Sequence, residues 1–229
     1  MRTQRSLSLI TFSGLDGAGK STQIQLLVRR LTELGLESIV LWTRAGYTPG
    51  CAAMKSLARR LAGRRLPAAG PSEQRSALLR RPWVRRIWLI VAFLDLVFSL
   101  LRIRLLRHRG RIVMCDRYLD DSLIDFHLNF AFEQAWLERL MAWIAPRPDA
   151  AFLLLIPVPE SLRRSDVKRE PFRDGENVLE RRLGEYQRFA DRGRYRVIDG
   201  TQGVEAIAVS IADAVGLPRA GGHAYQPAA

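Results

Sequence analysis

Residues 14–21 read Gly14-Leu15-Asp16-Gly17-Ala18-Gly19-Lys20-Ser21 and match the pattern G-x-x-x-x-G-K-[ST]. An alternating apolar run, residues 7–13, precedes this octapeptide, and a helix-like segment, residues 20–35, follows it. A strand, a glycine-rich turn and a helix in that order place backbone N–H groups and a positive helix N-terminus around an anion. A glycine-rich turn can also arise there by chance, but this setting favours a phosphate-binding loop.

Two side chains of the loop have a specific use in binding a nucleoside triphosphate. The Lys20 ammonium would reach the β- and γ-phosphates, and the Ser21 hydroxyl would hold Mg²⁺. The chain contains three lysines, so 33 of its 36 basic residues are arginine, yet one lysine stands at this position. We expect ATP and Mg²⁺ as cofactors, with ATP bound by residues of the loop and the start of the helix: Gly14, Gly17, Ala18, Gly19, Lys20, Ser21 and Thr22.

The composition is that of a folded, strongly basic protein. The 229 residues carry a net charge of +13, with 48% hydrophobic and 26% charged residues, which suits one globular domain. Nucleic acid, an anionic membrane surface or a polyanionic small substrate could each attract this charge. Zinc-binding, RNA-recognition and basic-zipper patterns are absent from the sequence. We therefore favour a site for several phosphates on an arginine-rich chain and expect no nucleic-acid partner.

The cysteine count and the N-terminus favour a cytoplasmic protein. Cys51 and Cys115 form no framework of disulfide spacings. The first residues contain no apolar secretory segment. We expect one domain over residues 1–217, including a lid at about 159–176, and a disordered tail over residues 218–229, which are rich in Gly, Ala and Pro.

Residues 87–101 are apolar enough to require comparison with a membrane span. The segment is 15 residues long, has arginines on both sides and carries Asp95 near its centre. A transmembrane helix needs about 20 apolar residues and is strongly disfavoured by a central carboxylate. We therefore expect no integral membrane segment and predict a buried core helix. Peripheral attachment through the flanking arginines remains an alternative.

Strand-like and helix-like segments alternate along the chain, which predicts a parallel sheet with helices on both faces. Strands are expected at residues 7–13, 38–43, 111–115, 150–156 and 195–198. Helices are expected at residues 20–35, 52–62, 74–108, 118–144, 159–192 (interrupted by a loop) and 203–215. Pro82 is expected to kink or divide the helix over 74–108. The predicted fold class is α/β: a three-layer P-loop NTPase fold with a five-stranded parallel sheet and a helical lid.

Asp116 and Arg117 directly follow the apolar strand-like run over residues 111–115. Ligands bind at the carboxyl edge of a parallel sheet. A carboxylate at that edge, beside the phosphate-binding loop, would hold Mg²⁺ directly or through water, so Ser21 and Asp116 are the candidate metal ligands. Arg117 could pair with a substrate phosphate in a bidentate way. A structural salt bridge after the strand is the alternative, and the neighbouring loop argues against it.

A basic segment over residues 159–174 is the third candidate element. Its cations lie about one and a half helical turns apart, so that some share a face: Arg163, Arg164, Lys168 and Arg169. A basic segment that closes over ATP would neutralise the charge on the transferred phosphoryl oxygens and would exclude water. Because Glu160, Asp166 and Glu170 alternate with these cations, a solvated charged helix remains the alternative.

Together these residues resemble the thymidylate kinase family of nucleoside monophosphate kinases, from residue 7 to about 215. The resemblance rests on residues 12–23, Thr43-Arg44, residues 110–118, residues 158–160 and residues 197–200. It implies transfer of the γ-phosphoryl group of ATP to a (deoxy)nucleoside monophosphate, with dTMP the first candidate, and a homodimer. Some members carry a catalytic arginine at the loop position that is Gly17 here. The resemblance therefore implies that the catalytic cations are Lys20 and those of the lid, namely Arg163, Arg164, Lys168 and Arg169.

The resemblance also implies acceptor-binding residues. Asp16 would meet the sugar hydroxyl of the acceptor, Arg44 and Arg117 would approach its phosphate, and Phe93 would stack on its base. The full set is Asp16, Arg44, Phe93, Asp95, Arg117 and Tyr118.

The acceptor pocket departs from the family pattern in two places. The long helix usually carries an arginine for the acceptor phosphate, whereas Asp95 lies near that place here. After Tyr118, the family usually shows a Ser followed by a small-Tyr-Gln triplet, whereas residues 122–127 of this chain read Ser-Leu-Ile-Asp-Phe-His. These changes direct attention to a pocket with Asp95, Asp125 and Phe126.

Other functions remain open. The altered pocket suits a relative that phosphorylates a nucleoside or a modified sugar. A GTPase would need Asn-Lys-x-Asp, and a transporter ATPase would need Leu-Ser-Gly-Gly-Gln; the sequence contains neither. A non-catalytic nucleotide-binding protein whose basic surface docks to a membrane or to nucleic acid is the last alternative, and the intact Lys20 and Asp116 argue against it.

Overall fold

The computed structural model describes residues 7–44, 81–130, 135–168 and 174–218. Within these residues five strands form one sheet: β1 (Leu9–Gly14), β2 (Ser38–Trp42), β3 (Ile112–Asp116), β4 (Ala150–Leu155) and β5 (Arg196–Asp199). Their order across the sheet is β2-β3-β1-β4-β5, and all neighbouring strands are parallel. The five-stranded parallel sheet predicted from the sequence is confirmed.

The central strands are the apolar runs of the sequence. Every residue of β1 is buried, and β3 and β4 are nearly as well covered, because helices lie on both faces of a parallel sheet. The edge strands β2 and β5 are partly exposed. Alternate residues of β1 pack on opposite faces: Ile10 and Phe12 join one apolar cluster, and Leu9 joins the other.

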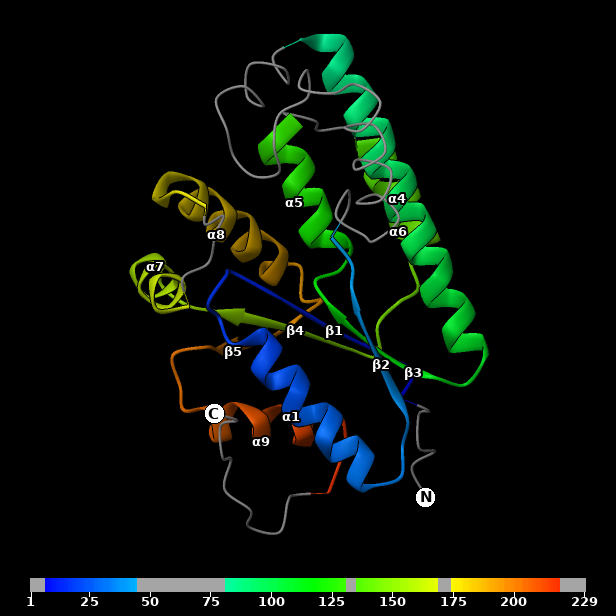
Figure 1. The fold of residues 1–229 in the computed structure, drawn as a ribbon, viewed down its shortest axis with the longest axis vertical. Coiled ribbons are helices and arrows are strands. Elements are labelled where there is room, and N and C mark those ends of the chain that lie inside the picture. Colours follow the sequence, from blue (N-terminus) through cyan, green and yellow to red (C-terminus); the bar gives the residue numbers. More distant parts are fainter. Residues whose placement is uncertain (1–6, 45–80, 131–134, 169–173, 219–229) are drawn as a thin grey trace.

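The helices form the outer layers of the fold. The described helices are α1 (Lys20–Glu33), α4 (Pro82–His108), α5 (Leu119–Phe130), α6 (Ala135–Ile144), α7 (Val158–Val167), α8 (Glu176–Asp191) and α9 (Val204–Ala214). Figure 1 shows α1 and α9 on one side of the sheet and α4, α5, α6 and α8 on the other. The described residues therefore form the three layers of a P-loop α/β fold, as predicted.

Several element boundaries differ from the sequence-based expectations. Pro82 neither kinks nor divides a helix: it is the first residue of α4, where its missing N–H has no helical partner to lose. The expected helix over 52–62 and residues 74–80 of the expected long helix lie outside the described residues. So does the expected tail apart from Pro218. The expected strand 38–43 ends at Trp42, one residue early.

The α4 helix is not the fully buried core helix that its composition predicts. One face packs on the sheet and on α5 and α6 through Ala92, Leu96 and Leu100. The opposite face carries a stripe of exposed apolar side chains, here called the α4 stripe: Trp83, Ile87, Ile90, Leu94, Phe98, Leu101 and Leu105. None of the described helices is long and apolar enough to cross a membrane.

Candidate active site

The phosphate-binding loop lies at the point where the chain changes direction across the sheet. The next strands of the chain lie on one side of β1, and β4 and β5 lie on the other. Open parallel sheets bind ligands at the carboxyl ends of their strands at such a point. Gly14 ends β1 with φ 138°, and a Cβ there would lie 2.2 Å from the Leu154 carbonyl oxygen. Gly17 and Gly19 also have positive φ, which lets the loop turn into the N-terminus of α1.

Lys20 is buried beneath the loop. Its Nζ donates hydrogen bonds to the carbonyl oxygens of Gly14 at 2.9 Å and Leu15 at 2.7 Å. Burial, followed by repulsion from Arg117, lowers the pKa of this ammonium to about 8, although nearby carboxylates oppose the shift. The described residues thus leave Lys20 with incomplete charge compensation at a loop shaped for an anion.

Ser21 and Asp116 meet across the neighbouring strand end. The Ser21 hydroxyl donates a hydrogen bond of 3.1 Å to Asp116 Oδ2. The parallel register sets Asp116 beside Phe12, two residues before the loop begins. Mg²⁺ in nucleotide enzymes takes one or two protein oxygens and completes its shell with phosphate oxygens and waters. The hydroxyl and carboxylate fit that donor set, and the described residues contain no cluster of three or more acidic, Cys or His ligands.

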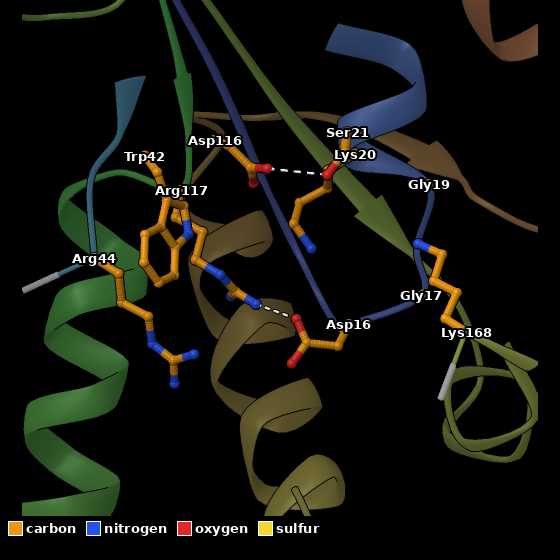
Figure 2. Close-up of a pocket in the computed structure, with 10 residues that line it drawn as sticks. All are labelled: Asp16, Gly17, Gly19, Lys20, Ser21, Trp42, Arg44, Asp116, Arg117 and Lys168. Carbon is orange, nitrogen blue, oxygen red and sulfur yellow. Dashed lines mark hydrogen bonds and ion pairs between the residues drawn. The ribbon is translucent and has the colours of Figure 1, made fainter. Parts of the chain in front are cut away.

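A hollow of about 270 Å³ opens in front of the loop (Figure 2). This volume lies just below the usual range for ligand pockets, about 300–1,000 Å³, so the hollow as described fits phosphate groups better than whole nucleotides. Four cations and two carboxylates give it a positive lining. The lining residues are Asp16, Gly17, Gly19, Lys20, Ser21, Trp42, Arg44, Asp116, Arg117 and Lys168.

Arg117 enters the hollow in an unusual backbone conformation. Its φ is 72°, a value that is rare for a residue with a side chain and costs about 1–3 kcal/mol. Its N–H bonds the Phe12 carbonyl oxygen at 2.8 Å, and its own carbonyl accepts a hydrogen bond from Thr43. These bonds tie the chain after β3 to the ends of β1 and β2, so the strained turn aims the side chain of Arg117 toward the loop.

The guanidinium of Arg117 is buried among acidic and hydroxyl partners. It pairs with Asp16, and its Nη1 lies 3.3 Å from Asp121 Oδ1 and 3.2 Å from the Tyr186 hydroxyl. Burial alone would raise the pKa of the Asp16 carboxyl, but Arg117 and more distant cations hold it below its usual value. Asp121 also accepts hydrogen bonds from Ser13 at 2.6 Å and from Tyr186 at 2.6 Å. Arg117 is therefore held in place from β1, α5 and α8.

Arg44 is held by a carboxylate from α5. Its Nε and Nη2 donate to Asp125 Oδ2 at 2.5 Å and Oδ1 at 3.0 Å, a bidentate pair. Arg182 Nη2 lies 2.8 Å from the same Oδ1. Burial alone would raise the pKa of Asp125, but these two guanidiniums hold it below its usual value. Asp125 thus connects the hollow to α8.

The lid cations have different environments. Arg163 is largely exposed and pairs with Glu160. Arg164 also bonds Glu160, and its Nη1 donates to the carbonyl oxygens of Gly17 and Gly200, both at 3.0 Å, so it braces the loop from outside the hollow. Lys168 lines the hollow on the far side of Gly17 (Figure 2). Arg169 lies outside the described residues.

Several predicted site residues do not line the hollow. Tyr118 is buried in the core and donates its hydroxyl to Pro146 O at 2.7 Å, so its expected contact with the acceptor is not supported. Phe93 packs on the same core cluster, and Asp95 lies elsewhere on α4. Asp95, Asp125 and Phe126, the residues of the expected altered pocket, are not among the lining residues of this hollow, and Phe126 is buried in the core.

The remaining predicted ATP residues support the loop from below or beside it. Gly14 and Ala18 are buried and are not among the lining residues, and Thr22 lies partly buried on α1. Trp42, the last residue of β2, does line the hollow and is half exposed. Its position one residue before Thr43-Arg44, at a strand end, was the only signal in the sequence. Tyr186 and Arg182 carried no signal, because their partners Asp121 and Asp125 are distant in the chain. Asp121 lies four residues after Arg117, but its contacts with Ser13 and Tyr186 join distant parts of the chain.

The fold and this hollow are those expected of a P-loop nucleotide kinase: a glycine-rich loop, Lys20 and the hydrogen-bonded Ser21 and Asp116 line the same hollow as Arg44 and Arg117. Comparison with known proteins narrows the class. The chain is 32% identical to a thymidylate kinase of Bartonella henselae over 216 residues, covering 89% of this chain and 93% of the relative. It is 32% identical to a thymidylate kinase of Thermomicrobium roseum over 210 residues, covering 88% and 91%.

An archaeal relative is also similar. A probable thymidylate kinase of Pyrococcus abyssi is 32% identical over 165 residues, covering 69% of this chain and 70% of the relative. No protein-family profile matches the chain. The chain belongs to the thymidylate kinase family, and it is a nucleoside monophosphate kinase.

Proposed function

We propose that the protein transfers the γ-phosphoryl group of ATP to a nucleoside monophosphate, and that dTMP is the acceptor. One observation carries this proposal: Lys20 and the Ser21–Asp116 pair line the same hollow as Arg44 and Arg117. Two sets of anion-binding groups at one hollow suit a reaction between two phosphates. The names of the relatives supply the choice of dTMP.

The chain contributes position and charge rather than covalent chemistry. The loop N–H groups and Lys20 would hold the β- and γ-phosphates, while Arg44 and Arg117 would hold the acceptor phosphate in line with them. Mg²⁺ bound by Ser21 and Asp116 would supply charge neutralisation at the β- and γ-phosphate oxygens. Asp16, which pairs with Arg117 at the edge of the hollow, would accept a hydrogen bond from the acceptor sugar.

Among the described lid cations, Lys168 is the best candidate for the transferred phosphoryl group. It lines the hollow, whereas Arg163 pairs with Glu160 at the surface and Arg164 bonds two loop carbonyls. An ammonium beside the transferred group would neutralise charge that develops on its equatorial oxygens. The anchoring of α7 to the loop, including Ser161 Oγ to Asp16 O at 2.7 Å, would set the distance from Lys168 to the phosphates.

The test is a coupled assay of ADP release with ATP, Mg²⁺ and dTMP. Parallel reactions contain other nucleoside monophosphates, thymidine, a sugar panel and no acceptor. Rapid ADP release with dTMP, at least about tenfold faster than with any other acceptor, is the expected result. Turnover of a nucleoside or sugar but not of monophosphates would overturn the choice of acceptor. ATP binding with no turnover in any reaction would favour a non-catalytic role.

We also propose that the enzyme is a homodimer that buries the α4 stripe. Ile90, Leu94 and Phe98 are 58–65% exposed in the single chain, an arrangement that soluble proteins usually cover with a partner. Trp136 and Trp143 of α6, which packs against α4, extend the apolar surface. A second copy offers an identical apolar stripe, which suits a twofold interface.

Sedimentation velocity tests the dimer. Phe98→Glu should convert a dimer to a monomer, while Val209→Glu, an exposed apolar site on α9, should leave the sedimentation coefficient unchanged. A wild-type monomer that binds anionic lipid vesicles through α4 would instead support peripheral membrane attachment.

A further inference from the structure

Arg182 is a buried arginine that lies behind the acceptor side of the hollow. It belongs to α8, and its side chain is 4% exposed. Its Nη2 lies 2.8 Å from Asp125 Oδ1 and 3.2 Å from Asp174 Oδ2. Its Nε and Nη1 have no hydrogen-bond partner in the part of the chain that the structure describes. Within the described residues, Nη2 thus contacts both carboxylates, and Nε and Nη1 contact neither of them.

Stability does not explain an arginine in this setting. A buried N–H without a partner destabilises the folded state. Replacing a buried ion pair by apolar side chains of similar size is often neutral or stabilising. An apolar residue on this face of α8 would satisfy packing without the desolvation of a guanidinium. The arginine is therefore better explained by what it does to its partners.

Its main partner, Asp125, also holds Arg44. Asp125 Oδ1 accepts from Arg182 Nη2 at 2.8 Å and from Arg44 Nη2 at 3.0 Å, while Oδ2 accepts from Arg44 Nε at 2.5 Å. With bonds to Arg182 and Arg44 at once, the carboxylate cannot turn about its Cβ–Cγ bond without losing one of them. The planar fork of Arg44 follows the plane of the carboxylate.

The charges around Asp125 also support an effect of Arg182 on Arg44. Two buried guanidiniums, those of Arg44 and Arg182, share the buried carboxylate of Asp125, and Arg182 opposes the rise that Asp125 causes in the pKa of Arg44. Asp174, the other partner of Arg182, is 30% exposed and is screened by solvent. Arg182 therefore weakens the attraction between Asp125 and Arg44, which favours the approach of an anion to Arg44.

We propose that Arg182 is a positioning residue that acts through Asp125 to hold the Arg44 guanidinium in place for the acceptor phosphate. This inference rests on the proposed function, since it takes a nucleoside monophosphate as the acceptor. Arg182 does not contact the acceptor in this arrangement. It orients Arg44 and maintains its attraction for a phosphate.

The first experiment compares Arg182→Met with Arg181→Met, which removes the same charge from the exposed neighbour on α8. Arg182→Met should raise KM for dTMP by about 10–100-fold, the range seen when a residue that orients a metal ligand is removed. KM for ATP should stay within about twofold, and Arg181→Met should match wild type. Calorimetry should show weaker dTMP binding but unchanged thymidine binding, because thymidine has no phosphate. Equal weakening of both ligands, or no change in dTMP binding, would overturn the proposal.

Two further variants keep the test decisive. Arg182→Lys keeps the positive charge but loses the planar guanidinium, so its KM for dTMP should lie between those of wild type and Arg182→Met. If Arg182→Met does not fold, the proposal requires that Arg182→Lys by itself raises KM for dTMP. In an Arg44→Met background, Arg182→Met should have no further effect on dTMP binding. Independent, additive effects would show that Arg182 does not act through Arg44.

A substrate-free measurement separates this inference from the proposed function. Arg44 and Arg182 should be coupled in the urea midpoint of unfolding when Asp125 is present, and uncoupled in an Asp125→Asn background. If Arg44 and Arg182 are coupled but the protein phosphorylates no monophosphate, the contacts among Arg182, Asp125 and Arg44 are supported and the proposed function is contradicted. If wild type turns over dTMP but Arg44 and Arg182 are not coupled and Arg182→Met leaves KM for dTMP unchanged, the inference about Arg182 is contradicted and the proposed function stands.

Discussion

The two sides of the hollow treat their buried cations in opposite ways. On the loop side, burial and then Arg117 lower the pKa of Lys20 to about 8. On the acceptor side, burial alone would lower the pKa of Arg44, but the bidentate contact with Asp125 raises it above its usual value. The loop thus holds a cation that lacks full compensation, whereas the acceptor side holds a cation whose counter-charge is already in place.

This difference predicts different binding behaviour. A triphosphate that binds at the loop would supply negative counter-charge to the Lys20 ammonium. Binding would therefore reduce the electrostatic cost of burying that ammonium. An acceptor phosphate would instead meet an arginine that is already oriented and must share it with Asp125. The gain on that side comes from preorganisation rather than from relief of an unpaired charge. The predictions below test the contrast, beginning with the largest expected effect.

Lys20→Met should lower turnover by at least about 10³-fold, because under the proposed function the ammonium would stabilise the charge on the transferred group. Below pH 8 the buried amine is charged at an energetic cost, since its folded pKa lies below its unfolded value of 10.5. The unfolding midpoint at pH 7 without nucleotide should therefore rise or stay level. Steady-state kinetics and thermal unfolding give both values. A large loss of stability would mean that the two carbonyl hydrogen bonds outweigh the electrostatic cost.

Lys168→Ala should lower kcat by about 10²–10³-fold and change KM for ATP less, because its contact would strengthen as charge moves onto the transferred group. Arg163→Ala is the matched control on the same lid. Its exposed pair with Glu160 contributes little, so kcat should change by less than about twofold. Single-turnover kinetics with dTMP measures both variants. A larger effect at Arg163 than at Lys168 would reverse the assignment within the lid.

Affinity for ATP should fall by about tenfold between pH 7 and pH 9. In the enzyme without nucleotide, Lys20 loses its proton above about pH 8. Because the proposed complex with ATP requires a charged Lys20, ATP binding above that pH takes up a proton. Calorimetry in buffers of different ionisation enthalpy measures the affinity and the proton uptake. Lys20→Met should bind more weakly and lose this dependence. A dependence that persists in Lys20→Met would belong to another group.

The sequence predicted the local parts of the fold and site well. The central strands are apolar runs buried on both faces, and the glycine-rich loop and Asp116 are defined by residues near them in the chain. The bracing of the loop by Arg164 depends on two carbonyl oxygens from separate loops, and Asp125 and Arg182 lie on different helices. Such contacts follow from packing, which a single sequence does not reveal.

The α4 helix shows another limit. An apolar residue every three or four positions looks the same whether the face packs in a core or lies at the surface of one chain. The structure distinguishes the two faces through exposure: Leu96 is buried, and Leu94 is 59% exposed. Pro82 was misjudged for a similar reason, because proline suits a helix start as well as it disrupts a helix interior.

The lowered pKa of Lys20 also makes this amine a selective target for covalent labelling. Near pH 8 about half of the Lys20 side chains carry a neutral, nucleophilic amine, and the chain has two other lysines, Lys55 and Lys168. A small amine-directed electrophile that enters the hollow would acylate Lys20, and mass spectrometry would resolve the modified peptide from few competing sites. Bound ATP would protect the amine by covering it and by raising its pKa, so that the amine takes up a proton from the buffer. Under the proposed function, this arginine-rich chain, with one lysine of lowered pKa in the hollow, is suited to covalent labelling that reports whether the hollow is occupied by nucleotide.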